Sequence, residues 1–323
     1  MIITRTPYRI SLFGGGTDHP EWYRENGGAV VSFTIDKYCY INLRELPPFF
    51  DHSYRISYSK IEMKKHLSEI EHPAVRESFR KYAPNLNLEL HHLGDLPARS
   101  GVGSSSAFAV GIINALLALN TKSASKIELT NMAIELEQRS LKENVGSQDQ
   151  IACAFGGINY IEFGPGESWT VEKINLSPKY IKEIEDRIVL IYSGIDRSSS
   201  DVTASLLENL NSKSRIMNRT RELAQECKSI FEKEGDLTSI GPMLNEGWQL
   251  KIMANPLTVN DKLEKIFLKA ANAGAEGGKI LGAGGGGFLI FWVDPKNREK
   301  FIERMQPELV VPFCISFDGS VKL

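Results

Sequence analysis

The segment from Leu96 to Asn120, LPARSGVGSSSAFAVGIINALLALN, constrains the fold most, because a glycine- and serine-rich turn runs directly into an unbroken apolar stretch. The first turn of a helix there has free N–H groups and the positive end of the helix dipole, and the glycines allow a ligand close to the backbone. Two interpretations stay open from this stretch alone: a serine that caps the helix, or a phosphate-binding turn. Apolar residues on two adjacent ridges predict that the helix is buried: Phe108, Ile112, Leu116 and Leu119, then Val110, Ile113 and Leu117.

The composition narrows the class of protein. A chain of 323 residues exceeds what one core usually fills, so two domains are expected. The net charge of −2 argues against nucleic acid as the main partner. The longest apolar run is too short to span a bilayer, and the N-terminal residues do not form a secretory signal. Four scattered cysteines and six histidines without metal spacing predict reduced thiols, no histidine metal site and a cytoplasmic location.

Periodicity and turn residues predict two α+β domains, with the boundary near 177–184. In the first domain we expect strands over 8–13, 29–35, 38–43, 86–93, 156–163 and 169–176, and helices over 60–82, 104–120 and 126–143. In the second domain we expect strands over 187–194, 287–293 and 309–317, and helices over 203–233, 236–250, 260–273 and 295–305. Ser125 and Glu128 form a capping box ahead of the helix over 126–143.

Two common nucleotide-binding motifs are excluded. The chain contains no GxxxxGK[ST] sequence, so it has no Walker-type phosphate loop. Gly282, Gly284 and Gly287 match GxGxxG, but a dinucleotide-binding fingerprint follows a strand and opens a helix. Here a predicted helix comes before the glycines and a predicted strand comes after them, so a Rossmann site is not expected.

Three separated motifs remain. The first motif is RTPYRISLFGGGTDHPEWY (Arg5–Tyr23), the second is PARSGVGSSSA (Pro97–Ala107) and the third is KILGAGGGGFLIF (Lys279–Phe291). In this order they resemble the GHMP kinases, the family of galactokinase, homoserine kinase, mevalonate kinase and phosphomevalonate kinase. The second motif is similar to the family's P-x-x-x-G-L-G-S-S-A-A, with Val102 for Leu and an extra hydroxyl at Ser106. The resemblance covers essentially the whole chain.

This resemblance implies an α+β fold of two domains with the active site between them. The N-terminal, ATP-binding domain would span 1–180 and contain a left-handed β-α-β unit. The C-terminal domain would span 181–323 and be ferredoxin-like. The left-handed crossover is implied by the resemblance alone, since the general rule for such units predicts the opposite hand.

The resemblance also implies that the chain binds ATP and Mg²⁺. The phosphates would lie on the second motif, at Pro97, Arg99, Gly101, Val102, Gly103, Ser104, Ser105 and Ser106. Magnesium would be held by Ser105 and by a glutamate of the following helix. Glu135 has Arg139 four residues on, which is typical of a surface ion pair. Glu137 shares an inward ridge with Ile134 and Leu141, so we expect Glu137 to be the ligand. Without the resemblance, a solvated carboxylate is the alternative.

Asp149, in GSQDQIACAFGG, is the expected catalytic residue. The local alternative is a helix start, with Ser147 and Gln150 as a capping box and Asp149 beside the dipole. The resemblance to galactokinases implies instead that Asp149 accepts the proton of the attacking sugar hydroxyl. It also implies that Arg9 keeps this carboxylate ionised and faces the transferred phosphoryl group. The alternation of its predicted strand, taken alone, would indicate that Arg9 is a surface residue.

The first motif bears on the substrate. Galactokinases carry G-E-H-T-D where this chain has Gly15, Gly16, Thr17 and Asp18, so two polar side chains are absent and galactose is disfavoured. Within the family, FGGGTDHPEWY, GGAVVSFTIDKYCYI and YSGIDRSSSD resemble the heptose 7-phosphate kinases. Arg197, beside three serines, could then hold the phosphate of the substrate, or this loop could be merely solvated. The expected substrate-binding residues are Gly15, Gly16, Thr17, Asp18, Arg197, Gly284, Gly285 and Gly286.

We therefore expect transfer of the γ-phosphoryl group of ATP to the anomeric hydroxyl of D-glycero-α-D-manno-heptose 7-phosphate. The product would be the 1,7-bisphosphate on the way to GDP-heptose for capsule or related glycans. The alternatives are a 1-kinase for another sugar such as L-fucose, a sensor that binds sugar and ATP without catalysis, and a non-catalytic interaction protein. The partner would be a small sugar phosphate, with neither nucleic acid nor membrane, and a homodimer is compatible with the sequence.

Overall fold

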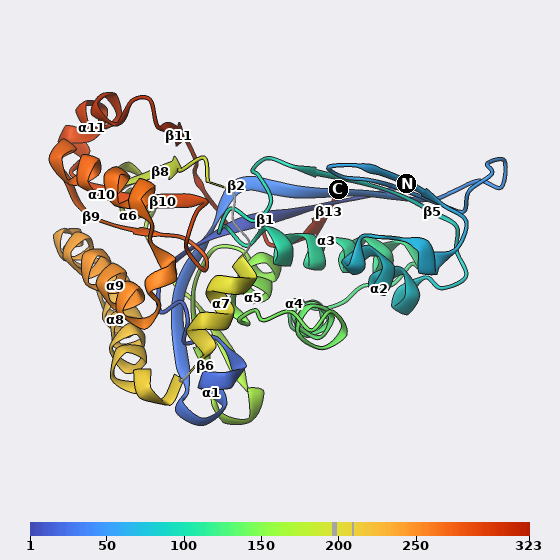
Figure 1. Cartoon of the computed structure of the whole chain (residues 1–323), viewed down its shortest axis with the longest axis horizontal. Helices are drawn as coiled ribbons and strands as arrows, with labels where there is room; N and C mark the ends of the chain where they lie inside the picture. Colours follow the sequence, from blue (N-terminus) through green and yellow to red (C-terminus); the bar gives the residue numbers. More distant parts are fainter. Residues whose placement is uncertain (196–198, 209) are drawn as a thin grey trace.

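The computed structural model describes residues 1–195, 199–208 and 210–323. Two long antiparallel strands, β1 (Ile2–Phe13) and β2 (Gly28–Glu45), form the centre of the first sheet (Figure 1). The path of this sheet is β13-β1-β2-β5-β3-β4, and β12 and β6 also pair with β2. The other strands are β3 (Tyr54–Ser57), β4 (Ile61–Lys64), β5 (Leu88–Gly94), β6 (Ile158–Phe163), β7 (Trp169–Lys173), β12 (Ile315–Ser316) and β13 (Val321–Lys322).

The apolar helix predicted after the serine turn is α3 (Ser104–Leu119), which packs against β1 and β2. Gly111 favours this close approach, because a Cβ there would lie only 3.0 Å from Thr6 Oγ1. The Thr4 hydroxyl also donates to the Gly111 carbonyl at 3.0 Å. The neighbouring helices are α1 (Pro20–Asn26), α2 (Pro73–Tyr82), α4 (Lys126–Ile134) and α5 (Gln148–Phe155).

The second sheet is antiparallel with the order β11-β8-β10-β9. With helices between the first and second strands and between the third and fourth, this is the ferredoxin-like arrangement, so that prediction is confirmed. The strands are β8 (Ile188–Tyr192), β9 (Ala275–Ile280), β10 (Phe288–Val293) and β11 (Leu309–Val311). The helices are α6 (Pro178–Arg187), α7 (Ser199–Leu207), α8 (Ser214–Glu232), α9 (Ile240–Ala254), α10 (Asp261–Ala273) and α11 (Arg298–Met305).

The two parts of the fold are joined by more than the chain between them. After β11 the C-terminal residues return to the first sheet, where β12 pairs with β2 and β13 pairs with β1. Figure 1 accordingly shows both chain ends near each other on the first sheet. In the part of the chain that the structure describes, no helix is long and apolar enough to cross a membrane.

The structure differs from the prediction in several elements. Residues 60–82 form β4, a short 3-10 turn and α2, because Pro73 starts the helix. The carboxylate of Glu62 faces inward and accepts the backbone N–H groups of Glu71 and His72. The expected strand over 309–317 is split into β11 and β12 around Pro312. The strand β9, with the sequence AEGGKI, was missed because two glycines weaken its pattern.

Candidate active site

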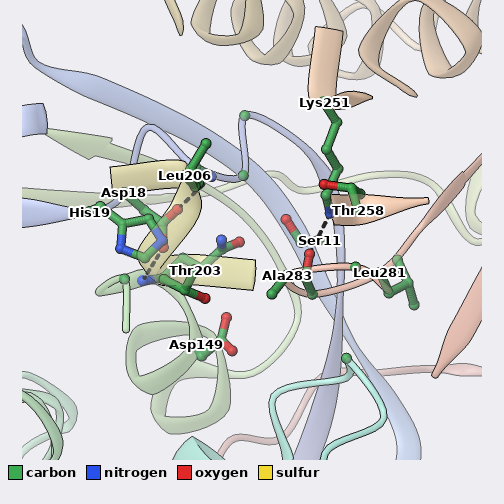
Figure 2. Close-up of a pocket in the computed structure, with 18 of the residues that line it drawn as sticks. Ser11, Asp18, His19, Asp149, Thr203, Leu206, Lys251, Thr258, Leu281 and Ala283 are labelled. Carbon is green, nitrogen blue, oxygen red and sulfur yellow. Dashed lines mark hydrogen bonds between the residues drawn. The ribbon is translucent and has the colours of Figure 1, made fainter. Parts of the chain in front are cut away.

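A cavity of about 230 Å³ lies where the three motifs meet. Figure 2 shows residues that line it, from β1 and the following turn, from α5, α7 and α9, and from the third motif. The predicted site residues that line the cavity are Arg9, Gly15, Gly16, Asp18, Arg99, Gly101, Gly103, Ser104, Ser105, Ser106, Asp149, Gly284 and Gly286. The fold therefore brings segments that lie far apart in the sequence to one place.

Arg9 and Asp149 form a bidentate pair at the floor of this cavity. Arg9 Nε donates to Asp149 Oδ1 and Nη2 to Oδ2, both at 2.8 Å. Its Nη1 also donates to the Gly101 carbonyl at 2.6 Å, so Arg9 joins the first motif to the second. Burial raises the pKa of Asp149, and the Arg9 guanidinium opposes that rise. The Arg9 side chain is almost fully buried, whereas 24% of the Asp149 side chain stays exposed.

The N-terminus of α3 opens directly on the cavity. Its N-cap residue is Gly103, with φ +74°, and in the described part of the chain no side chain caps the helix. The serine-cap interpretation is therefore wrong, and backbone N–H groups at this end remain for a ligand. The Ser104 hydroxyl instead accepts the Arg99 N–H at 3.0 Å. Val102 is buried, and its carbonyl accepts the Arg9 N–H at 3.0 Å.

Glu137 lies behind this helix end and is fully buried. Its carboxylate accepts hydrogen bonds from Ser105 Oγ at 2.5 Å, Ser106 Oγ at 2.7 Å and Gln150 Nε2 at 2.6 Å. Burial raises the pKa of Glu137 to about 7, although the hydroxyls lower it. The prediction that Glu137 lies on an inward-facing ridge is confirmed, because its side chain is buried. The residue sits in a π-helical turn, Glu135–Ser140, a distortion that is frequent at functional sites.

Two local alternatives for neighbouring residues were wrong. Glu135 pairs with Lys81 at 2.7 Å and not with Arg139, which pairs with Glu167. The capping box expected at α5 does not form, because the Gln150 amide bonds to Glu137 and the N-cap Ser147 makes no side-chain cap. Asp149 is therefore held by Arg9 and not by the helix start.

The turn of the first motif is fixed by its own side chains. Asp18 Oδ1 accepts the Gly16 N–H at 2.9 Å, and Oδ2 faces the Gln148 N–H at 3.3 Å. Thr17 is fully buried, and its hydroxyl donates to the Gly14 carbonyl at 2.8 Å. Its side chain shapes the turn instead of facing the cavity, which corrects the prediction that Thr17 contacts the substrate.

The third motif is the turn between β9 and β10, which explains why it does not open a helix. It packs closely on the second motif: a Cβ on Gly101 would lie 2.6 Å from the Leu281 carbonyl oxygen. The Gly285 N–H donates to the Thr258 carbonyl at 2.7 Å, so Gly285 holds the turn while its neighbours line the cavity. Pro97 accepts the Ser100 hydroxyl at 2.6 Å and is not among the cavity residues. Arg197 lies outside the described residues.

Several cavity residues were not predicted from the sequence. Ser11, His19, Gln148 and Thr258 each have a buried side-chain polar atom without a hydrogen-bond partner in the structure. Such unpaired groups are costly, so together they indicate a polar ligand. Lys251 and Lys279 also line the cavity. Lys279 opens the third motif and Ser11 and His19 lie within the first, but no pattern in the sequence marks them.

Comparison with known proteins gives matches in both parts of the chain. Residues 68–157 match the model of the GHMP kinases N terminal domain, and residues 222–310 match that of the GHMP kinases C terminal domain. The D-glycero-alpha-D-manno-heptose 7-phosphate kinase of Campylobacter jejuni is 30% identical, over 95% of this chain and 94% of its own length. A galactokinase of Pyrococcus furiosus is 25% identical over 93% of this chain and 91% of its own length.

Among solved structures, a D-glycero-D-manno-heptose 1-phosphate kinase from Bacteroides thetaiotaomicron superposes with a TM-score of 0.81. It is 24% identical and covers 100% of this chain and 99% of its own, so it supports the fold. The chain belongs to the GHMP kinases. It is accordingly an enzyme of the phosphotransferase class, a sugar kinase of the two-domain α+β fold.

Proposed function

We propose that this chain transfers the γ-phosphoryl group of ATP to the anomeric hydroxyl of D-glycero-α-D-manno-heptose 7-phosphate. The observation that carries the proposal is the Arg9–Asp149 pair, which lies in the cavity between the helix end of the second motif and the turn of the first. A phosphoryl transfer needs a donor site, an acceptor site and a group for the acceptor's proton. We assign the donor site to the second motif, the acceptor site to the first motif and the proton to Asp149.

Asp149 would orient the sugar hydroxyl and accept its proton. Its carboxylate is partly exposed to the cavity, while the bidentate contact with Arg9 fixes its orientation and favours the ionised form. The guanidinium stays charged at every working pH and would also face the phosphoryl group as it moves. A sensor that only binds sugar and ATP would have no need of this pair.

The residues at the start of α3 fit a magnesium ion. The Ser105 hydroxyl and the Glu137 carboxylate are hard oxygen donors, already in contact beside the free N–H groups of the helix. Glu137 would be held as a carboxylate when the cation is bound, since the pKa near 7 reflects burial without one. The cation would neutralise charge on the phosphates of ATP. The described residues contain no cluster of three or more His, Cys, Asp or Glu able to hold a metal, so phosphate and water would complete the shell.

The unpaired polar atoms of Ser11, His19, Gln148 and Thr258 support a sugar in the remaining space, because hydroxyls can both donate and accept. The assignment to a heptose 7-phosphate rests on the Campylobacter relative and on the motif resemblance. Arg197 remains our prediction for a contact with the substrate's phosphate, outside the described residues.

The test is an ADP-release assay with Mg·ATP and a panel of sugars: heptose 7-phosphate, the unphosphorylated heptose, L-fucose and galactose. We expect the highest kcat/KM on heptose 7-phosphate, with the new phosphate on the anomeric oxygen by phosphorus NMR. Faster turnover of L-fucose, or phosphorylation at another hydroxyl, would contradict the substrate assignment. Arg197→Ala should erode the preference for the phosphorylated sugar more than the apparent affinity for ATP.

A further inference from the structure

Two lysines, Lys251 at the end of α9 and Lys279 in β9, line the cavity and have no role in the transfer described above. Lys279 Nζ donates to the Ser11 and Leu12 carbonyls at 3.2 and 3.1 Å. Lys251 Nζ donates to the Gly282 carbonyl and, at 3.4 Å, to the Ile280 carbonyl. With two of three donors used on each ammonium, one remains on each for a ligand.

These two ammonium groups lack a matching anion. Within the described part of the chain neither lysine forms an ion pair with a carboxylate, whereas the neighbouring Arg9 is already paired with Asp149. Burial lowers the pKa of Lys279 to about 8, and burial and the charge of Lys279 lower that of Lys251 well below its ordinary value. Such a cluster is costly until an anion enters it.

The position of the pair favours the acceptor side of the cavity. Lys279 is tied to the β1 carbonyls directly before Gly14, Gly15 and Gly16, the turn we assign to the sugar. The buried hydroxyl of Ser11, whose carbonyl holds Lys279, has no hydrogen-bond partner among the described residues. Figure 2 shows the Lys251 side chain entering the cavity from the side opposite to Asp149. We assign the phosphates of ATP to a different place, the end of α3.

We propose that Lys251 and Lys279 hold the phosphate that the sugar carries before the reaction, at the end of the substrate away from the anomeric carbon. Dianionic phosphate matches two ammonium donors and the Ser11 hydroxyl. This inference rests on the proposed function for the identity of the sugar. It assigns a phosphate contact to residues that the structure describes, and it does not depend on the separate prediction for Arg197.

The test compares kcat/KM for heptose 7-phosphate and for the unphosphorylated heptose on the wild type, Lys251→Met and Lys279→Met. The ratio of the two values does not depend on how much enzyme is folded. We expect each substitution to lower this ratio by about 10- to 100-fold, the loss typical of a hydrogen bond to a charged group. Lys265→Met, at an exposed position of α10, is the matched control and should leave the ratio unchanged. Equal losses on both sugars with a raised KM for ATP would assign the lysines to the transferred phosphoryl group and overturn the proposal.

A second measurement separates this inference from the proposed function. Binding of inorganic phosphate is followed by calorimetry with the nucleotide site saturated by magnesium and a non-hydrolysable ATP analogue. We expect the wild type to bind phosphate and the Lys251→Met/Lys279→Met double variant to lose at least about 10-fold in affinity. If the wild type acts on neither heptose, the substrate assignment fails, and the phosphate measurement still decides on the lysines. Equal phosphate affinity of the wild type and the double variant would refute the anion site.

Discussion

Asp149 is the residue on which the proposed chemistry depends most. Asp149→Asn keeps the size of the side chain and its place in α5 but removes the charge that Arg9 pairs with. We expect kcat to fall by roughly 10²-fold or more, with the KM of the sugar little altered, because proton acceptance acts in the transition state. An anomeric hydroxyl is more acidic than an ordinary alcohol, so orientation by Asp149 contributes alongside its basicity.

The measurement compares the steady-state kinetics of Asp149→Asn with those of a control variant, Asp318→Asn. Asp318 is an exposed partner of Arg5 outside the cavity, so its variant should keep the wild-type rate. A normal rate in Asp149→Asn combined with a lower melting temperature would show that the Arg9 pair serves the fold alone.

Glu137 should make the stability of the free protein depend on pH. Its pKa is about 7 in the folded chain and near 4.5 when exposed, so the folded state binds more protons between these values. The stability contributed by this group is therefore fully present below pH 4.5 and is lost as the pH rises through about 7. Glu137→Gln removes the titration. The unfolding free energy of the wild type relative to Glu137→Gln should fall between pH 5 and pH 7, as measured by urea unfolding.

Glu137→Gln also tests the magnesium role, with Glu135→Gln as the matched control. Glu135 is half exposed and pairs with Lys81, so its loss should change little. We expect Glu137→Gln to lower kcat strongly at any magnesium concentration, because the carboxylate is lost as a ligand. A full rate at saturating magnesium would assign the metal to other groups.

At the scale of single residues, the sequence indicated the site only where a motif marks it. Arg9, Asp149 and Glu137 were located by the resemblance, and their contacts agree with the roles it implies without testing them. Thr258 comes from a short 3-10 turn and Lys251 from a long helix, so only the tertiary fold brings them to the cavity. Pattern reasoning cannot find residues of that kind, because nothing local distinguishes them from surface or core positions.

At the scale of elements, prediction succeeded where a continuous run of apolar residues marks a buried helix or strand. The helix after the serine turn and the β8 and β10 strands are apolar enough to be unambiguous. It failed over 60–82, where a strand, a turn and a helix share one polar stretch. The β9 strand was missed for a structural reason: Gly277 and Gly278 permit close contact with α9 and β10, at the expense of strand propensity.

The contact between the second and third motifs gives a prediction about the phosphate turn. Gly101 has φ +85°, and a Cβ there would lie 2.6 Å from the Leu281 carbonyl oxygen. Gly166 has φ +69° with nothing within 4 Å of a Cβ, so it is a matched control for backbone strain alone. We expect Gly166→Ala to cost about 1–2 kcal/mol of unfolding free energy, and Gly101→Ala to cost at least about 2 kcal/mol more.

Gly101→Ala should in addition raise the KM for ATP, because the Gly101 carbonyl holds Arg9 and the turn shapes the phosphate site. Denaturant unfolding and ATP kinetics on both variants make the comparison. If Gly101→Ala and Gly166→Ala lowered the unfolding free energy equally, the prediction would be contradicted, because the contact between the second and third motifs would then not contribute to stability.

At the scale of the whole molecule, the two sheets fold as one structure. The described C-terminal residues carry β12 and β13 back to the first sheet, and the largest apolar core contains residues of both parts, such as Phe33 and Trp292. A division of the chain at 180/181, as the sequence suggests, would leave β1 and β2 without these partners. Expressed alone, residues 1–180 should therefore not unfold cooperatively.

Removing residues 312–323 isolates the contribution of this C-terminal segment. The loss of Ser316 and Ser320 would leave buried hydroxyls of Thr34 and Thr6 without the partners they bond at 2.7 and 2.8 Å. The truncation also removes the pairing of β12 with β2 and of β13 with β1, and each lost hydrogen bond costs about 1 kcal/mol, so the truncated chain should lose about 3 kcal/mol or more of unfolding free energy. Because Arg9 lies on the same strand as Thr6, kinase activity should fall together with the stability.

Removal of Leu323 alone is the control, because this residue is exposed and its loss removes one backbone hydrogen bond, to Ile3. Calorimetry and ADP-release assays compare the chain that lacks residues 312–323 with the chain that lacks Leu323. If the chain that lacks residues 312–323 kept the wild-type melting temperature, the prediction would be contradicted, because the first sheet would be stable without β12 and β13.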